Sequence, residues 1–212
     1  MATDTAAVRR RNEERARRRQ RRRDELLDVA DRVLQARGTK VSMDELAAEA
    51  GITKPVLYRH FGDKDGLYEA LTRRYIDELA RALKPAVAVA ADDPRSRLAA
   101  TIDAYLSYVE REPGRYRFLL HAGEQPRTAP IVADFRRNHI ANCAFTAAEN
   151  LEKAGLDPGF AEPWAQCVNG MVRAAGSSWL ESRSLPRDLL VQYLTTILWD
   201  GYSALRRGSA RN

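Results

Sequence analysis

One segment, residues 41–71 (VSMDELAAEAGITKPVLYRHFGDKDGLYEAL), constrains the fold of this chain more than any other feature. Ser42 and Glu45 form an S-x-x-E capping box, in which the Ser oxygen accepts a bond from a free N–H of the first helical turn and the Glu side chain binds the N–H of the cap residue. A short helix is therefore predicted directly after the cap. Ala47 lies where a second helix would cross, so its small side chain allows two backbones to approach closely, and Gly51 supplies a tight turn.

A second short helix is predicted after this turn, with Thr53 as its cap and Pro55 in its first turn. Leu57 and Phe61 lie four residues apart and are expected to face inward together with Ile52. A small residue, a glycine four positions later and a leucine six positions after that form the packing pattern of a helix-turn-helix. In that motif the N-terminal end of the second helix enters the major groove of DNA.

The outward side of the second helix carries groups that suit DNA. Lys54 and Arg59 can donate to guanine edges, and Val56 can contact a thymine methyl group. Phosphate contacts are expected from other polar side chains of the motif, which are Ser42, Thr53, Tyr58, His60 and Lys64. An ordinary solvated helix face is the alternative, but it does not account for the capping box, the spacing and the exposed aromatic residue together.

The rest of the chain shows helical periodicity, without a Val/Ile/Thr run that has the alternation of a strand. We therefore predict an all-α fold of about nine helices, with a helix-turn-helix domain of three helices followed by a larger helical bundle. The first helix is expected near 22–37, ending at Gly38, and Pro85 is expected to stop the fourth. The helices predicted after the motif cover residues 64–84, 95–111, 114–121, 129–154, 159–182 and 187–207.

Positive charge is concentrated at the N-terminus. Residues 1–23 hold ten Arg against three acidic residues, a net charge of +7, so the remainder of a chain with net charge +6 sums to −1. This distribution excludes a protein coated with positive charge, such as a histone-like packager. We expect a flexible Arg-rich arm over 1–21, a DNA-binding domain over 22–67 and a ligand-binding and dimerisation domain over 68–212.

Other classes of protein are excluded by what the sequence lacks. No apolar run approaches the roughly 18 residues that span a bilayer, and acidic residues interrupt the segment after the basic start, so neither a membrane protein nor a secretory signal is expected. Cys143 and Cys167 form no disulfide framework and no metal-binding spacing, which suits a reducing cytoplasm. His139 and Cys143 share a helix face, but no further ligands complete a metal site.

The sequence favours a DNA-binding regulator over two other functions. An all-α enzyme with a basic tail is disfavoured, because the sequence has no nucleophile-base set, no paired carboxylates and no phosphate-binding Gly loop, and no cofactor is expected. An architectural DNA binder acting through the Arg-rich arm alone stays open to test.

The sequence AGITKPVLYRHFGDKDGLYEAL, within 22–71, resembles the signature of the TetR family of bacterial transcriptional regulators. The resemblance implies a homodimer, a DNA-binding domain of three helices, a helical core that binds a small molecule, and relief of repression by that effector. It also implies operator contacts from seven positions, which are Lys54, Pro55, Val56, Tyr58, Arg59, His60 and Lys64. The Arg-rich arm lies outside the family's usual pattern.

The ligand site is predicted from aromatic residues of the C-terminal region and from polar residues placed among apolar ones, since ligand cavities combine an apolar lining with a few orienting groups. The predicted ligand-binding residues are Tyr105, Tyr116, Phe118, His121, Phe135, His139, Trp164, Asn169, Arg173 and Trp179. Core packing is the alternative for each aromatic residue, and a helix-terminal role is the alternative for His121.

The last two helices are predicted to form the dimer interface. One holds six small residues, which are Gly170, Ala174, Ala175, Gly176, Ser177 and Ser178. The other has more apolar residues than one face needs, including Tyr193, Ile197, Tyr202 and Leu205. Burial within one subunit is the alternative. For the effector, the segment EPGRYRFLLHAGEQPRTAPIVADF and the later GLDP are similar to TetR-family regulators of fatty-acid and lipid metabolism, which implies an acyl chain or acyl-CoA.

Overall fold

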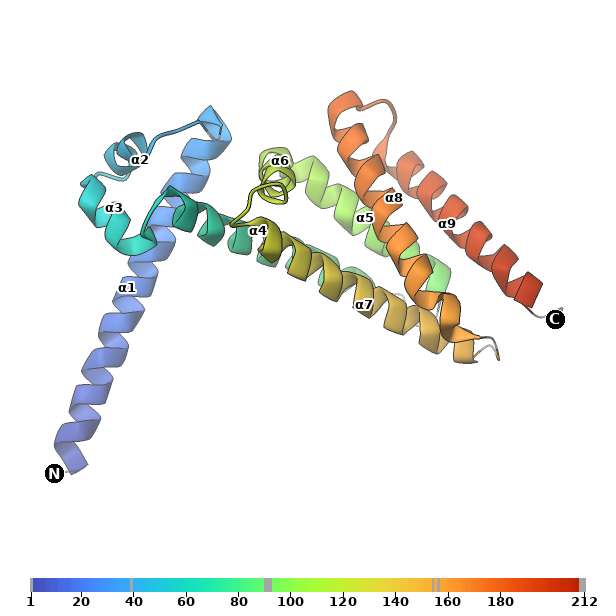
Figure 1. Ribbon diagram of the computed structural model, residues 1–212, viewed down its shortest axis with the longest axis horizontal. Helices are drawn as coiled ribbons and strands as arrows, with labels where there is room; N and C mark the ends of the chain where they lie inside the picture. The colour runs from blue at the N-terminus through green and yellow to red at the C-terminus, as the bar shows by residue number, and fades with distance from the viewer. Residues whose placement is uncertain (1, 39, 90–92, 154, 156, 210–212) are drawn as a thin grey trace. The chain divides into compact units, whose positions relative to one another are not determined.

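The structure is a computed structural model that describes residues 2–38, 40–89, 93–153, 155 and 157–209 (Figure 1). Side chains are described over the same set except at residues 2–8, 87–89 and 202–209. Two compact units divide the chain, Met1–Arg73 and Arg74–Asn212. In the described residues the regular structure consists of nine α-helices and one short 3-10 helix, without a strand, which confirms the predicted fold class.

The N-terminal unit is built from α1 (Ala2–Arg37), α2 (Met43–Glu49), α3 (Lys54–Phe61) and the first turns of α4 (Lys64–Val89). Each helix contributes apolar residues at helical spacing to one small core, made of Leu26, Leu27, Ala30, Val33, Leu34, Met43, Leu46, Ala47, Leu57, Phe61, Leu67 and Leu71. Gly38, which follows α1, has φ +77° and ends that helix as predicted.

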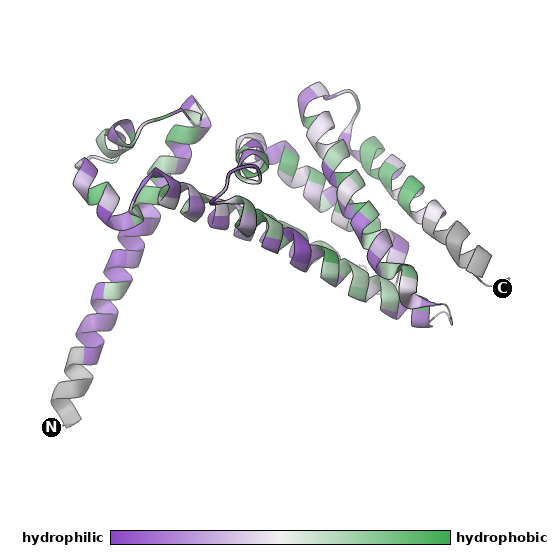
Figure 2. Ribbon diagram, in the orientation of Figure 1, coloured by the Kyte–Doolittle hydropathy of each residue, from purple (hydrophilic) through white to green (hydrophobic). Residues whose placement is uncertain are grey.

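Helix α1 begins at Ala2, not near residue 22 as predicted. The segment from Ala2 to Arg37 contains no Pro or Gly, and its Arg, Glu, Ala and Gln residues are good helix formers, so nothing in it stops the helix. An exposed ion pair, Arg9 to Glu13 at 3.2 Å, spans one turn of this part. Figure 2 shows that the N-terminal half of α1 is hydrophilic along most of its coloured length.

The C-terminal unit holds the remainder of α4 and the helices that follow it, which are α5 (Pro94–Arg111), α6 (Pro113–Ala122), α7 (Ala129–Lys153), the 3-10 helix Pro158–Phe160, α8 (Ala161–Ser182) and α9 (Arg187–Ser209). Helix α7 packs on α8, and α5 packs on α9. The larger core of this unit comprises Leu98, Ile102, Leu106, Val172, Trp179, Leu194 and Leu198.

Helix α4 contributes to both units, because the division at Arg73 and Arg74 falls within it. The prediction that Pro85 stops this helix is wrong, since α4 continues to Val89. Pro85 lies in the last two turns, where the loss of one backbone hydrogen bond is less costly than in mid-helix. Asp93 then caps α5 by accepting bonds from the backbone N–H groups of Arg95 and Ser96.

Candidate DNA-binding face and ligand cavity

The predicted capping box is present at the start of α2. The Ser42 hydroxyl oxygen accepts from the Glu45 N–H at 3.2 Å, and the Glu45 carboxylate accepts from the Ser42 N–H at 2.8 Å. These bonds from Ser42 lower the pKa of Glu45, so the carboxylate stays ionised and favours the helix N-terminus.

The turn between α2 and α3 has the geometry of a helix-turn-helix. Gly51 takes φ +63°, which favours glycine, and the Ile52 N–H donates to the Ala47 carbonyl at 3.0 Å. Ala47, Leu57 and Phe61 are buried as predicted, and Ile52 is half-buried. The spacing in the sequence therefore fixes which face of α3 points away from the core.

The start of α3 differs from the prediction at two side chains. Thr53 occupies the cap position, but its side chain makes no capping hydrogen bond. The Lys54 ammonium donates to the Asp44 carboxylate at 2.8 Å, and this bond raises the pKa of Lys54. Lys54 would therefore have to leave Asp44 before it could contact a base. The Thr53 hydroxyl makes no capping bond to α3 that a phosphate contact would have to replace.

The remaining predicted DNA contacts lie along α3 and the start of α4. Tyr58 is an exposed aromatic residue at 38% relative exposure, and Arg59 is also exposed. Pro55 lies in the first turn and is exposed, while Val56 is half-buried. Lys64 is half-buried, with its ammonium 5.5 Å from the centre of the Tyr68 ring.

His60 lies in a strongly positive environment. Burial lowers its pKa, and the nearby positive charges of Arg59, Arg19, Arg22 and Arg23 lower it further. Its Nδ1 atom is buried and has no hydrogen-bond partner among the described residues. At neutral pH the imidazole is therefore uncharged in the free protein.

The same electrostatic contacts place part of the arginine-rich helix beside α3. The Arg23 guanidinium lies 5.0 Å from the centre of the Phe61 ring, in the last turn of α3. Arg19 and Arg22 are close enough to His60 to lower its pKa. Arg19, Arg22 and Arg23 of α1 thus lie near the last turn of α3.

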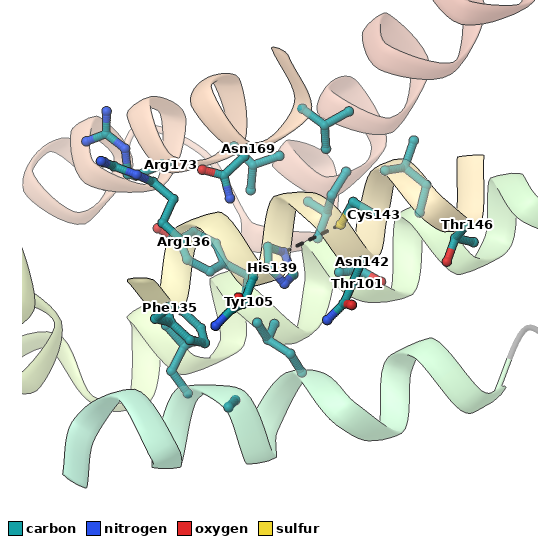
Figure 3. A pocket seen from close by; sticks show the side chains of 18 of the residues that line it. Thr101, Tyr105, Phe135, Arg136, His139, Asn142, Cys143, Thr146, Asn169 and Arg173 are labelled. Atoms are coloured by element: carbon teal, nitrogen blue, oxygen red, sulfur yellow. Dashed lines mark hydrogen bonds between the residues drawn. The ribbon is translucent and has the colours of Figure 1, made fainter. Parts of the chain in front are cut away.

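A cavity of about 610 Å³ lies within the C-terminal unit, in the size range of small-molecule sites (Figure 3). Helices α4 to α8 form its wall, with Trp199 from α9. Seven of the predicted ligand-binding residues line it, which are Tyr105, Tyr116, Phe135, His139, Trp164, Asn169 and Arg173.

Three predicted ligand-binding residues do not line this cavity. Phe118 is buried with its ring edge-on to Tyr75, at 5.2 Å between centroids. Trp179 is buried in the core and donates from its indole N–H to the Leu185 carbonyl at 2.8 Å. His121 is exposed in the last turn of α6, as expected for a helix-terminal residue. The sequence pattern found these residues because inward-facing positions include both core and cavity.

A chain of hydroxyl groups extends from the cavity wall. The Tyr105 and Tyr116 oxygens are 2.7 Å apart, and the Tyr116 and Ser177 oxygens are 3.0 Å apart. Because Ser177 donates to the Arg173 carbonyl at 3.0 Å, it accepts from Tyr116, which in turn accepts from Tyr105. Burial raises the pKa of Tyr105 well above its ordinary value, so this neutral phenol offers the cavity acceptor lone pairs.

Sequence reasoning missed several cavity residues, including Arg136, Arg97 and Lys84. Arg136 could have been found from helical phase, since it precedes His139 by three residues and Cys143 by seven on the same face of α7. The roles of Arg97 and Lys84 depend on how α4 and α5 pack, which has no local signal in the sequence.

His139 and Cys143 meet in the cavity wall, with 3.8 Å between the His139 Nε2 and Cys143 Sγ atoms. Burial lowers the pKa of His139 and raises the pKa of Cys143, so both side chains are neutral at pH 7. Within the described residues no group of three or more His, Cys, Asp or Glu side chains is placed to hold a metal ion.

The predicted run of small residues in α8 is divided between two faces. Gly176 is buried, and a Cβ atom there would lie 3.0 Å from the Tyr105 ring. Gly170 and Ala174 are exposed, as is Met171. On α9, Tyr193 and Ile197 are 51% and 59% exposed, while the side chains of Tyr202 and Leu205 lie outside the described residues.

No helix in the described part of the chain is long and apolar enough to cross a membrane.

Family profiles match both units. Residues 26–71 match the profile described as bacterial regulatory proteins, tetR family, and residues 82–209 match the tetracyclin repressor-like C-terminal domain.

Individual proteins match over most of the chain. An uncharacterized HTH-type transcriptional regulator of Mycobacterium tuberculosis is 32% identical over 83% of this chain and 75% of its own length. The HTH-type transcriptional activator FasR of Mycolicibacterium smegmatis is 30% identical over 84% of this chain and 82% of its own. The crystal structure of a TetR-like transcriptional regulator from Rhodococcus superposes with a TM-score of 0.67 at 25% identity, covering 85% of this chain and 94% of that one.

Proposed function

The chain belongs to the TetR family of bacterial transcriptional regulators, and on that premise we propose that it is a homodimeric repressor that a small apolar effector releases from its operator. The family and these relatives are transcriptional regulators, not enzymes. One observation carries the proposal: a helix-turn-helix with an exposed polar face and an apolar cavity of about 610 Å³ occur in the same chain. We further propose that it acts in the cytoplasm, with domain boundaries at 21/22 and 67/68.

Operator recognition is assigned to α3. Arg59 is the principal base-reading residue, because it is exposed and has no ion pair with the described residues to break before it reaches a guanine edge. Lys54 contributes less, because Asp44 competes for its ammonium group. The other operator contacts are assigned to Val56 and Pro55 by apolar contact, and to Ser42, Thr53, Tyr58, His60 and Lys64 through phosphates.

The arginine-rich part of α1 is an accessory to this reader. Its position beside His60 and Phe61 directs its charge toward the DNA that α3 contacts. Contacts from its Arg residues to phosphates release counterions and add affinity that does not depend on base sequence. An architectural role for the arm alone would leave the capping box and the exposed Arg59 without a function.

Dimerisation is assigned to α8 and α9. The exposed Gly170 and Ala174 would let a second helix approach closely, and the exposed Tyr193 and Ile197 would bury apolar surface. A two-fold dimer also presents two reading helices to two half-sites of one operator.

The effector is assigned to the cavity, with a fatty acyl chain or an acyl-CoA as the favoured class. Support comes from the apolar residues that α4, α5 and α6 place around the cavity, among them Ile76, Leu79, Leu98 and Leu119. An effector shifts the dimer between two states only if it binds one of them better. Helix α4 is the covalent connection between the cavity wall and the reader.

Selection of operators from randomised DNA duplexes tests the proposal. The full-length protein should enrich a palindromic sequence, and dodecanoate or lauroyl-CoA should release the labelled duplex in an anisotropy titration. The Arg59→Ala variant should enrich that sequence more weakly and without a base preference at one position of each half-site. Arg32→Ala, which changes an exposed arginine of the same unit outside the motif, should enrich it normally. Enrichment of no sequence, or equal enrichment of the same sequence by both variants, would refute the assignment of α3 as the reader.

A further inference from the structure

The charged residues that line the cavity are all of one sign. Among the described residues that form its wall, Lys84, Arg97, Arg136 and Arg173 are basic, and none is Asp or Glu. A cavity lined with charge of one sign and low-dielectric walls concentrates ligands of the opposite charge. A cationic ligand would find no carboxylate to pair with.

The ion pairs of the arginines in this unit show which guanidinium groups are already occupied. Arg115 pairs with Glu78 at 3.1 Å, and Arg187 pairs with Asp103 at 2.9 Å. Neither Arg136 nor Arg173 forms an ion pair with a carboxylate in the part of the chain that the structure describes. Both guanidinium groups therefore keep their donors available to a ligand.

These two arginines lie at the same end of the cavity in the close-up view, with Asn169 beside them and Thr146 toward the opposite end (Figure 3). Both are exposed to solvent, whereas Leu98, Ile102 and Val172 of the same wall are buried. An ionic group bound here would stay partly hydrated, which avoids most of the cost of burying a charge. Arg136 and Arg173 thus form a charged, solvent-exposed part of the cavity wall, and these apolar residues form a buried part.

The other polar groups near this end add no negative charge. His139 is neutral at pH 7 because burial lowers its pKa, so it can donate a hydrogen bond without opposing an anion. Tyr105 is a neutral phenol whose proton is directed to Tyr116, and Arg173 acts electrostatically on it. Asn169 supplies amide donors from α8.

We propose that the effector is an amphipathic anion, whose carboxylate or phosphate is bound by Arg136 and Arg173 while its apolar chain occupies the interior of the cavity. This inference rests on the proposed function, since it specifies the charge of the effector in that same site. A fatty acid and an acyl-CoA share this chemistry. Guanidinium groups from two helices, α7 and α8, would bind one anion, so the ligand would also bridge these helices.

Calorimetric titration of the full-length protein with probes that differ only in the head group tests the proposal. The probes are dodecanoate, dodecyl phosphate, lauroyl-CoA, dodecan-1-ol and dodecyltrimethylammonium, each below its micelle concentration. We expect an anionic probe to bind at least about tenfold more tightly than the alcohol, and the ammonium probe to bind most weakly. A preference for dodecanoate identifies a carboxylate ligand, and a preference for dodecyl phosphate or lauroyl-CoA identifies a phosphate ligand.

The variants Arg136→Gln and Arg173→Gln should each lower the preference for the anion over the alcohol by about tenfold. Arg137→Gln is the matched control, because Arg137 follows Arg136 on α7, pairs with Asp134 and does not line the cavity. Binding of dodecan-1-ol needs the cavity but not the arginines, so unchanged alcohol binding shows that each variant is folded.

Equal binding of the alcohol and the anions, no binding of any probe, or an equal loss in Arg137→Gln would overturn the inference. Operator release by each probe, followed by anisotropy, separates the two proposals. Release by the alcohol as effectively as by the anions would refute the anionic effector and leave the ligand-responsive regulator intact. Selective binding of the anions without release would support the anionic site and refute the proposed release.

Discussion

The two units hold their proposed sites in different ways. In the N-terminal unit the residues assigned to DNA are on the outer side of two short helices. In the C-terminal unit the residues assigned to the effector line a cavity whose wall comes from five helices and one residue of a sixth. Arg59 and Tyr58 are exposed and contribute little to their own core. Tyr116 and Val172 are buried and support the cavity and the core together. Changes to the outer face should therefore alter binding alone, while changes to the cavity should alter binding and stability together.

The largest effect is expected from a substitution that unfolds the N-terminal unit and leaves the C-terminal unit folded. A Cβ atom at Gly66 would overlap the carbonyl oxygen of Phe61, a backbone atom that cannot move aside cheaply. Gly66→Ala should therefore destabilise the N-terminal unit by at least about 3 kcal/mol and abolish operator binding. Urea unfolding followed by circular dichroism would measure the loss, and dodecanoate binding should persist. Gly170→Ala, where a Cβ meets no atom within 4 Å, is the control and should change stability little.

A second change tests whether the dimer contact of the C-terminal unit supports DNA binding by the other unit. Ile197→Asp places a charge on the exposed face of α9 and should cost more than about 2 kcal/mol of dimerisation. Sedimentation would show monomers, and operator affinity would fall although α3 is unchanged. Asp200→Asn, one turn further along α9, is the matched control. Dimers of Ile197→Asp with full affinity would contradict the assigned interface.

On the outer face of α3, Arg59→Ala should cost about 1 to 3 kcal/mol of operator affinity and relax base preference at one position. The loss in Lys54→Ala should be smaller, because the wild-type lysine must first leave Asp44. Anisotropy titrations with the cognate duplex and its single-base variants measure both. Thermal stability and effector binding should be unchanged. A large drop in either would contradict the expectation that changes to the outer face of α3 alter DNA binding alone.

Removal of residues 1–18 tests the accessory role of the arginines. Operator affinity should fall by a similar factor for every sequence, and the slope of log K against log salt should become shallower by about 0.9 for each lost phosphate contact. Base preference should stay the same. Loss of all binding in this truncation, with Arg59→Ala retaining it, would favour the architectural function instead.

The smallest expected effect concerns pH. Burial and four nearby arginines lower the pKa of His60 in the folded protein, so the unfolded chain takes up the proton first as the pH falls below about 6.5. The stability that the N-terminal unit has above this pH is therefore partly lost on acidification. Urea midpoints at pH 7.5 and 5.5 should differ less in His60→Gln than in wild type. Equal differences would exclude His60 as the cause.

The helix-turn-helix could be predicted from the sequence more completely than the cavity could. The capping box, the Gly51 turn and the buried Leu57 and Phe61 were predictable because each depends on residues within a few positions of one another. The cavity depends on packing between distant helices. Helical spacing therefore identified inward residues without separating Trp179 of the core from Trp164 of the cavity wall.

Two predicted helix boundaries are wrong, and each was predicted from one strong feature of the sequence. The charge of the first 23 residues favours a helix that begins near residue 22, although the segment lacks the glycine or proline that would keep α1 from beginning earlier. Pro85 favours a helix that ends before it, although a proline so near the end of α4 removes only one backbone hydrogen bond. The pairing of Lys54 with Asp44 could not be foreseen, because it depends on the angle between α2 and α3.

The helical state of the arginine-rich segment has a consequence for how salt acts on this protein. Along α1, Arg11, Arg15 and Arg19 follow one another at four-residue spacing, so like charges repel along one side of the helix. Added salt screens this repulsion and favours the helix over the coil, while it also weakens every phosphate contact that the helix makes. The two effects oppose each other. A plot of log K for operator binding against log salt concentration should therefore be curved, with its shallowest slope at low salt.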